Sequence, residues 1–322
     1  MSTRQEHRMV LASGRAHPDL ARAIAEELGT EVVPTEAYTF ANGELYIRFG
    51  ESVRGTDVFV IQSHADPINR SIMEHLIMVD ALKRASAARI TIVTPCYGYA
   101  RQDKKHRGRE PISARLMADL FKTAGADRIM AVDLHTAQIQ GFFDGPVDHL
   151  WAMPLLAAYI RTRVAPDNLT VVSPDAGRGR LADQWSDHLG APLAIIHKRR
   201  DPSVPNEARV HELVGEVEGR TCVIIDDMID TGGTIVQAAE ALKENGAEAC
   251  LVAATHGMLS GPAVERLRES SIQEVVVTDT LPIPDDKRWD GLTVLSIAPL
   301  IARAIKEVFD DGAVTSLFSG NT

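Results

Sequence analysis

Short runs of β-branched and aliphatic residues recur along the chain, and they limit its possible folds more than any other feature. They are continuous rather than alternating, which is typical of strands covered on both faces. Amphipathic helical patterns lie between them, as at 72–82 and 235–242. This alternation predicts an α/β fold with parallel sheets. The predicted strands are 58–61, 89–93, 129–132, 170–172, 193–196, 222–225, 251–253, 274–277 and 292–295.

A repeat divides the chain into two similar halves. Segment 53–61 resembles 217–225, and 81–85 resembles 241–245, each about half the chain length later. We therefore expect a duplicated α/β domain with a join near 145–154. The expected boundaries are 1–149, 150–300, and a C-terminal helix and tail at 301–322. Chance similarity between two βαβ units is the alternative.

Composition narrows the classes of function. Lys and Arg total 34 against 44 Asp and Glu, a formal net charge of −10, and only 5% of residues are aromatic. This balance argues against a nucleic-acid or membrane-surface binder, although a local basic site remains possible. No apolar run approaches the roughly 18 residues of a membrane span, and the N-terminal residues have no signal-peptide pattern. Together with three scattered cysteines, this predicts a cytoplasmic protein.

The strongest chemical signal follows the strand at 222–225. Two carboxylates, Asp226 and Asp227, precede a glycine-rich turn and a helix. Glycines let several backbone N–H groups converge on one anion, and the helix N-terminus adds positive potential. We therefore expect a phosphate cradle, with the paired carboxylates holding sugar hydroxyls or a metal on a sugar. An ordinary capped helix is the alternative. The turn residues are Asp230, Thr231, Gly232, Gly233 and Thr234.

Other segments carry weaker signals. The basic loop at 99–110 predicts a local anion site, a solvated charged loop being the alternative. His135 follows a strand, where a structural role is the more common one. Lys198 and Arg200 precede a polar, proline-containing stretch at 201–206 that we expect to be a mobile loop.

The turn at 226–234 resembles the phosphoribosyl-pyrophosphate loop of the phosphoribosyltransferase superfamily. Further motifs at 99–104, 133–148, 172–175 and 198–200 occur in the order seen in ribose-phosphate diphosphokinases. The resemblance extends from about residue 9 to 318. It implies two tandem phosphoribosyltransferase-like domains, each a mainly parallel sheet flanked by helices.

The resemblance also implies an activity. ATP and D-ribose 5-phosphate would give 5-phosphoribosyl 1-diphosphate and AMP, with Mg²⁺ as cofactor, in a homo-oligomer that is a hexamer in the family. Lys198 and Arg200 would be catalytic, and His135 and Asp175 would hold the metal. The implied ATP-binding residues are Phe40, Asn42, Gly43, Glu44, Arg101 and Gln102, the first four from a neighbouring subunit. The implied sugar-phosphate residues are Arg200, Asp226, Asp227, Asp230, Thr231, Gly232, Gly233 and Thr234.

Two positions depart from the family pattern. Asn42 stands where many members have Asp, and Arg178 stands where a second glycine is common. Three other functions remain as alternatives. Segment 177–182 fits the G-x-G-x-x-A form of a dinucleotide reductase. An ordinary phosphoribosyltransferase would share only the turn at 226–234, and a non-catalytic regulatory relative would have lost site residues that are present here.

Overall fold

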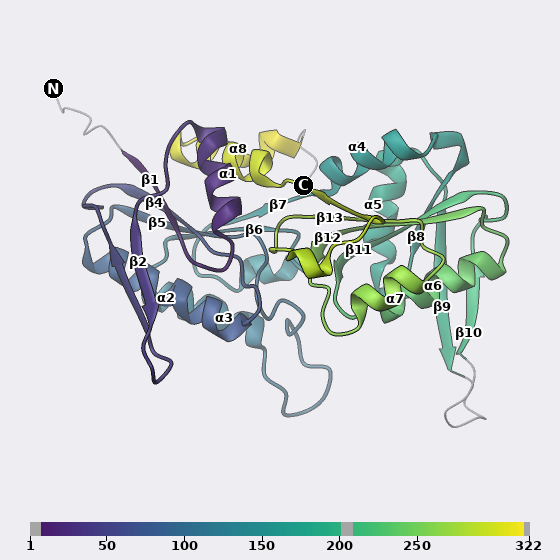
Figure 1. Ribbon diagram of the computed structural model, residues 1–322, viewed down its shortest axis with the longest axis horizontal. Helices are drawn as coiled ribbons and strands as arrows, with labels where there is room; N and C mark the ends of the chain where they lie inside the picture. Colours follow the sequence, from purple (N-terminus) through teal and green to yellow (C-terminus); the bar gives the residue numbers. More distant parts are fainter. Residues whose placement is uncertain (1–7, 201–208, 319–322) are drawn as a thin grey trace. The chain divides into compact units, whose positions relative to one another are not determined.

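The computed structural model describes residues 8–200 and 209–318, and it divides them into two compact units. The first comprises 8–151, 280–282 and 296–318, and the second comprises 152–279 and 283–295. Each unit is built on its own sheet (Figure 1).

The first unit has a five-stranded sheet in the order β1-β4-β5-β6-β7, with every neighbouring pair parallel. Its strands are β1 (Met9–Ser13), β4 (Asp57–Ile61), β5 (Arg89–Thr94), β6 (Arg128–Val132) and β7 (Val147–Leu150). Helices α1 (Pro18–Leu28), α2 (Ile68–Arg84) and α3 (Ser113–Ala124) alternate with them, and β2 (Thr35–Thr39) and β3 (Leu45–Phe49) form a separate antiparallel hairpin. Buried residues such as Ile92 and Phe121 fill the core. The continuous apolar runs become strands because helices cover the sheet.

The second unit has a seven-stranded sheet in the order β10-β9-β8-β11-β12-β13-β14. Among the described strands of this sheet, only β9 and β10 pair antiparallel. Its strands are β8 (Leu169–Ser173), β9 (Leu193–Arg200), β10 (Arg209–Val214), β11 (Thr221–Ile229), β12 (Ala249–Gly257), β13 (Glu274–Thr278) and β14 (Leu292–Leu295). Its helices are α4 (Met153–Arg163), α5 (Gly179–Leu189), α6 (Gly233–Glu244) and α7 (Ala263–Glu269).

The two halves of the chain contain the same elements in the same order. The first runs β1 α1 β2 β3 β4 α2 β5 α3 β6 β7 α4, and the second runs β8 α5 β9 β10 β11 α6 β12 α7 β13 β14 α8. The repeated segments 53–61 and 217–225 lead into β4 and β11, which hold equivalent places in this order. The order of elements therefore supports the duplication predicted from the sequence repeat.

The last helix of each half packs in the other half's unit. Helix α8 (Ala298–Phe309) packs against α1 and β7, as Figure 1 shows in yellow and purple, whereas α4 packs against α5, β12 and β13. The apolar face of α8, including Leu300, Ile301 and Ile305, is buried there. The sequence-based boundaries 1–149, 150–300 and 301–322 place a division within α8, after Leu300. Sequence analysis expected a C-terminal helix but did not identify the unit on which it packs.

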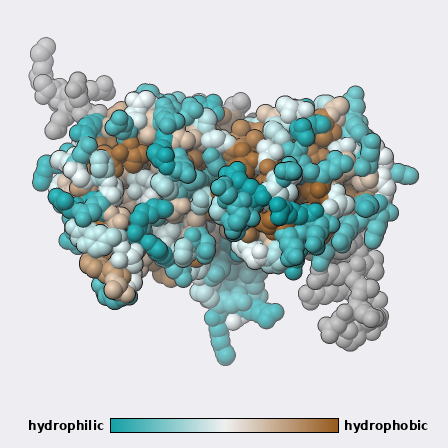
Figure 2. All heavy atoms as spheres, viewed as in Figure 1, coloured by the Kyte–Doolittle hydropathy of each residue, from teal (hydrophilic) through white to brown (hydrophobic). Residues whose placement is uncertain are grey.

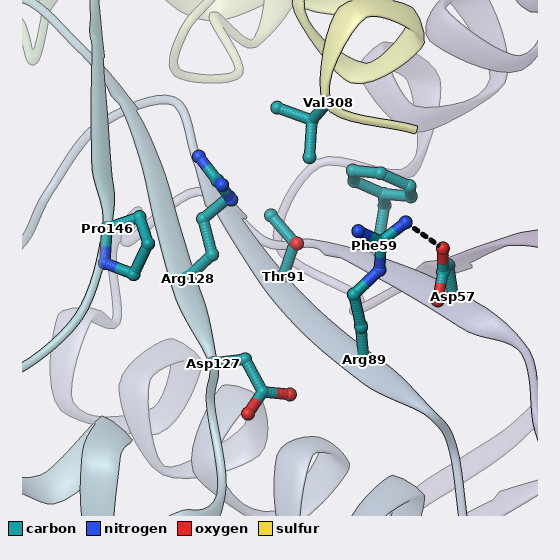
Figure 3. Close-up of a pocket in the computed structure, with 8 residues that line it drawn as sticks. All are labelled: Asp57, Phe59, Arg89, Thr91, Asp127, Arg128, Pro146 and Val308. Atoms are coloured by element: carbon teal, nitrogen blue, oxygen red, sulfur yellow. Dashed lines mark hydrogen bonds and ion pairs between the residues drawn. The ribbon is translucent and has the colours of Figure 1, made fainter. Parts of the chain in front are cut away.

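Arg89 ties α8 to the sheet of the first unit. Its guanidinium pairs with Asp57 on β4 and, at 3.0 Å, with Asp311 just beyond α8. A cavity of about 160 Å³ adjoins this cluster, and Val308 of α8 lines it together with Phe59 (Figure 3). Asp57 and Arg89 are the first residues of their strands. This cavity therefore lies at the amino ends of the strands, whereas ligands of open α/β sheets bind at the carboxyl ends.

Arg89→Met is expected to lower the free energy of unfolding by about 1–3 kcal/mol, because the buried Asp57 carboxylate loses its guanidinium partner. The larger loss typical of a fully buried pair does not apply, since the Arg89 side chain is 42% exposed. The matched control is Arg84→Met, which breaks an exposed pair with Asp80 on α2 and should cost no more than about 0.5 kcal/mol. Thermal unfolding of both variants measures the difference, and equal melting temperatures would contradict the prediction.

Candidate functional site

In the second unit, the predicted site residues gather at the carboxyl ends of parallel strands. Asp226 and Asp227 lie in β11, Asp175 follows β8, and Lys198 and Arg200 end β9. Two strands are longer than the sequence suggested: β11 continues to Ile229 rather than ending at 225, and β9 continues to Arg200 rather than 196. Both carboxylates of the pair are therefore held by a strand rather than by the following turn.

The glycine-rich turn leads directly into α6. Gly232 is the N-cap residue with φ +73°, a conformation that favours glycine, and Gly233 is the first residue of the helix. The segment after β12 fixes the turn, because Ser260 N–H donates to the carbonyl of Asp230 at 2.8 Å. The N–H groups at the start of α6 and the positive potential of the helix then converge on one place. This geometry suits a phosphate group.

Arg266 on α7 adds a positive charge beside this turn. Its Nη1 donates to the carbonyl of Thr231 at 3.2 Å, and lies 3.5 Å from where a Cβ on Gly233 would stand. The sequence reasoning missed this residue, because only the fold brings α7 beside the turn. No motif around Arg266 marks it.

Arg178 bridges the two carboxylates of β11. Its Nε lies 3.0 Å from Asp226 Oδ1, and its Nη2 lies 2.6 Å from Asp227 Oδ1. Asp226 Oδ1 also accepts a hydrogen bond from the backbone N–H of Asp227 at 2.8 Å. Burial, with the adjacent Asp227, raises the pKa of Asp226 well above the ordinary aspartate value, and Arg178 opposes this shift. Sequence analysis noted Arg178 only as a departure from the family pattern.

Asp175 caps the short 3₁₀ turn Ala176–Arg178. One carboxylate oxygen, Oδ1, accepts the backbone N–H groups of Gly177 at 2.8 Å and of Arg178 at 3.1 Å. The second oxygen takes no part in these two bonds. Asp175 can therefore serve as a ligand through that oxygen while the cap keeps the carboxylate oriented.

The Lys198–Arg200 segment belongs to a strand hairpin. Lys198 pairs with His211 and Arg200 pairs with Arg209 in the antiparallel ladder between β9 and β10. The structure describes the backbone here, and the expected mobile loop at 201–206 lies outside the described residues. The catalytic role predicted for Lys198 and Arg200 thus stays a prediction.

In the first unit, Arg101 and Gln102 lie exposed on the turn after β5. Gln102 Oε1 accepts a hydrogen bond from the Ser113 hydroxyl at 2.6 Å, and the backbone carbonyl of Gln102 accepts from Ala114 N–H at 3.1 Å. With its oxygen held this way, the Gln102 amide presents its NH₂ group as a donor.

Asp103 links this turn to the segment that carries His135. Its carboxylate is buried, and Oδ2 accepts hydrogen bonds from the Thr136 hydroxyl at 2.6 Å and from Gln138 Nε2 at 2.7 Å. His135 itself is half-buried. Sequence reasoning did not single out Asp103, since an aspartate among basic residues looks like an ordinary solvated charge.

The β2–β3 hairpin carries an exposed aromatic group. Phe40 is 45% exposed and packs edge-on against Tyr38 and Tyr46. In the turn between the strands, Asn42 Oδ1 accepts the backbone N–H of Glu44 at 3.1 Å. The Asn42 carbonyl oxygen therefore stabilises the turn itself.

The basic loop at 99–110 binds one of its own carboxylates. Glu110 accepts backbone N–H groups of His106 at 2.8 Å and Arg107 at 3.0 Å, which lower the pKa of Glu110. Glu110 therefore already uses two backbone donors of this loop, and the anion site predicted there stays a prediction.

Two further findings concern the described part of the chain. No helix there is long and apolar enough to span a membrane, and hydrophilic residues cover most of the face in Figure 2. Among the same residues, no three His, Cys, Asp or Glu side chains gather as a metal site.

Comparisons with known proteins identify the family that the chain resembles. Residues 9–125 match the model for the N-terminal domain of ribose phosphate pyrophosphokinase, and 202–319 match a phosphoribosyl synthetase-associated domain. Two relatives named ribose-phosphate pyrophosphokinase are similar over nearly their whole length. The Streptomyces coelicolor protein is 66% identical over 99% of this chain and 98% of its own, and the Mycobacterium tuberculosis protein is 61% identical over 97% and 96%.

A solved structure is similar as well. The crystal structure of phosphoribosylpyrophosphate synthetase from Mycobacterium smegmatis has a TM-score of 0.90 and 59% identity, covering 95% of this chain and 100% of that one. The fold class predicted from the sequence is thereby confirmed, and the dinucleotide-reductase and ordinary phosphoribosyltransferase alternatives fall away. The chain belongs to the ribose-phosphate pyrophosphokinase family.

Proposed function

We propose that this chain transfers the diphosphoryl group of ATP to the anomeric hydroxyl of D-ribose 5-phosphate, giving 5-phospho-α-D-ribose 1-diphosphate and AMP. The observation that carries the proposal is the strand, turn and helix at 221–244, with two carboxylates and a glycine bend, in a chain 66% identical to a named ribose-phosphate pyrophosphokinase.

The sugar phosphate binds at this bend. The 5-phosphate accepts hydrogen bonds from the backbone and hydroxyl groups of the turn at 230–234, at the start of α6. Asp226 and Asp227 accept hydrogen bonds from the ribose hydroxyls, and Arg200 contacts the sugar phosphate. Asp226 is the more accessible carboxylate, since its side chain is 15% exposed against 6% for Asp227.

ATP binds through Arg101 and Gln102 and through a second copy of the chain. The exposed Phe40 stacks on adenine, next to Asn42, Gly43 and Glu44 of the same hairpin. The active protein is therefore a homo-oligomer, and we propose a hexamer. Sedimentation equilibrium tests this assembly, and a fully active monomer would contradict it.

Mg²⁺ is the proposed cofactor, with His135 and Asp175 as protein ligands. The donor set fits a metal that arrives with its nucleotide, because one imidazole and one carboxylate leave most positions to phosphate and water oxygens. The Asp175 oxygen that is not used in the cap is available for this role. The ion would supply neutralisation of the polyphosphate charge.

Catalysis then rests on positioning and charge stabilisation. The anomeric oxygen attacks the β-phosphorus in line, the bond from that phosphorus to the α-phosphate oxygen breaks, and AMP leaves. Lys198 and Arg200 stabilise the negative charge of the transition state. No covalent enzyme intermediate is needed.

Product analysis tests the proposal. The protein incubated with Mg²⁺, ATP and ribose 5-phosphate should form AMP and the diphosphorylated sugar in equal amounts. Formation of ADP, or of AMP without the sugar product, would overturn the proposed reaction.

Asp103→Ala is expected to raise KM for ATP about tenfold, because two hydrogen bonds that order the nucleotide turn and the His135 segment are lost. Asp103→Asn keeps one acceptor oxygen, so its KM for ATP should rise less than that of Asp103→Ala. The exposed Asp144 supplies the control Asp144→Ala, which should leave KM unchanged. Steady-state kinetics at varied ATP measure the effect, and an unaltered KM in Asp103→Ala would contradict it.

A further inference from the structure

We infer that Arg178 is a positioning residue for the ribose diol: it bridges the Asp226 and Asp227 carboxylates and holds them oriented, so that they accept hydrogen bonds from the two ribose hydroxyls. This inference rests on the proposed function and adds to it a residue that neither the phosphate cradle nor the implied catalytic residues include.

The geometry of the contact supports this role. The guanidinium uses one edge, with Nε on Asp226 Oδ1 and Nη2 on Asp227 Oδ1. The guanidinium thus binds one oxygen of each carboxylate. The planar, rigid guanidinium fixes the two acceptors relative to each other, as a flexible ammonium group does not.

Burial makes the neutralising charge necessary. The Asp227 side chain is 6% exposed and the Arg178 side chain 19%. Two adjacent carboxylates in such surroundings repel each other, and the guanidinium between them lessens this repulsion and holds the pair in place.

The backbone of Arg178 is also held in place relative to Asp226 and Asp227. It ends the 3₁₀ turn that Asp175 caps, and its own backbone N–H donates to Asp175 Oδ1 at 3.1 Å. The residue therefore reaches β11 from a turn anchored at the end of β8.

Arg178→Met tests the inference by direct binding measurements with ribose 5-phosphate and 2-deoxyribose 5-phosphate. We expect affinity for ribose 5-phosphate to fall about 10- to 100-fold, the typical loss when a charge-assisted contact is removed. Affinity for the 2-deoxy sugar should fall less, because it has one hydroxyl fewer to orient. The preference for the ribose form should therefore shrink, and KM for ATP should stay within about twofold of the wild-type value.

Arg180→Met is the matched control, because Arg180 is exposed two residues further along and should leave both affinities unchanged. Arg178→Lys keeps the charge without the bridging edge, and it should recover part of the affinity. If Arg178→Met does not fold, Arg178→Lys carries the test alone. A reduced preference for the ribose form in Arg178→Lys then supports the inference, and an unchanged preference overturns it.

Three results with Arg178→Met would overturn the inference. Unchanged or tighter sugar binding would mean that Arg178 does not support the diol site. An equal loss of affinity for both sugar phosphates would mean that Arg178 acts on the 5-phosphate. A matching rise in KM for ATP would mean that Arg178 acts on the diphosphoryl group. Failure of the proposed function itself is distinguishable, since it would appear as an absence of AMP formation in the wild-type protein.

Discussion

Gly233→Asp is expected to weaken ribose 5-phosphate binding about 10²-fold while leaving the melting temperature unchanged or slightly raised. Gly233 is the first residue of α6, and the nearest atom to an added Cβ is Arg266 Nη1 at 3.5 Å, so the new side chain has space. An acidic residue at a helix start stabilises the helix by about 0.3–1 kcal/mol. The same carboxylate repels a bound phosphate, and at about 4 Å this costs about 1–4 kcal/mol.

Gly233→Asn is the matched control for this prediction, since it has nearly the same shape and no charge. It should lose far less affinity for the sugar phosphate, and both variants should keep a wild-type KM for ATP. Isothermal titration with ribose 5-phosphate and thermal unfolding separate binding from stability. Equal affinity of the Asp and Asn variants for ribose 5-phosphate would show that the 5-phosphate does not bind at this bend.

Lys198→Ala is expected to lower kcat about 10²- to 10³-fold, the usual cost of removing one group that stabilises transition-state charge. KM for ATP should change little, because the lost interaction is strongest in the transition state rather than in the bound ground state. Lys198 lies near the carboxyl end of β9, which pairs with β8, and β8 in turn pairs with β11, the strand that carries Asp226 and Asp227.

Lys243→Ala supplies the control for Lys198→Ala. This lysine is exposed in the last turn of α6, at the end of the helix away from the glycine bend, so kcat should not change. Single-turnover kinetics with labelled ATP isolate the chemical step. A near-normal kcat in Lys198→Ala would show that Lys198 does not stabilise the transition state.

The strands and the bend could be read from the sequence because their signals are local. Continuous apolar runs predicted the central strands, such as β5 and β12, since both faces of a parallel sheet are covered. The glycine bend predicted the start of α6, since a left-handed residue followed by a helix needs glycine. Less regular elements were missed, among them the half-exposed β2–β3 hairpin and the short β7.

The contacts of the site depend on residues that are distant in the sequence. Arg266 reaches the glycine bend from α7, Arg178 reaches Asp226 from the end of β8, and Asp103 binds Thr136. No local pattern marks these residues, because each looks like an ordinary solvated charge until its partner is known. The same holds for α8, whose packing partners α1 and β7 the sequence did not identify.

The sequence by itself determined the layered α/β halves, the duplicated order of elements and the strand-end carboxylates with their glycine bend, because these follow from hydrophobic pattern and backbone freedom over a few residues. The tertiary structure alone decided which charges meet. An ion pair or hydrogen bond between distant residues depends on the register of packed strands and helices, and that register is fixed by burial of the whole core rather than by the neighbours of either residue.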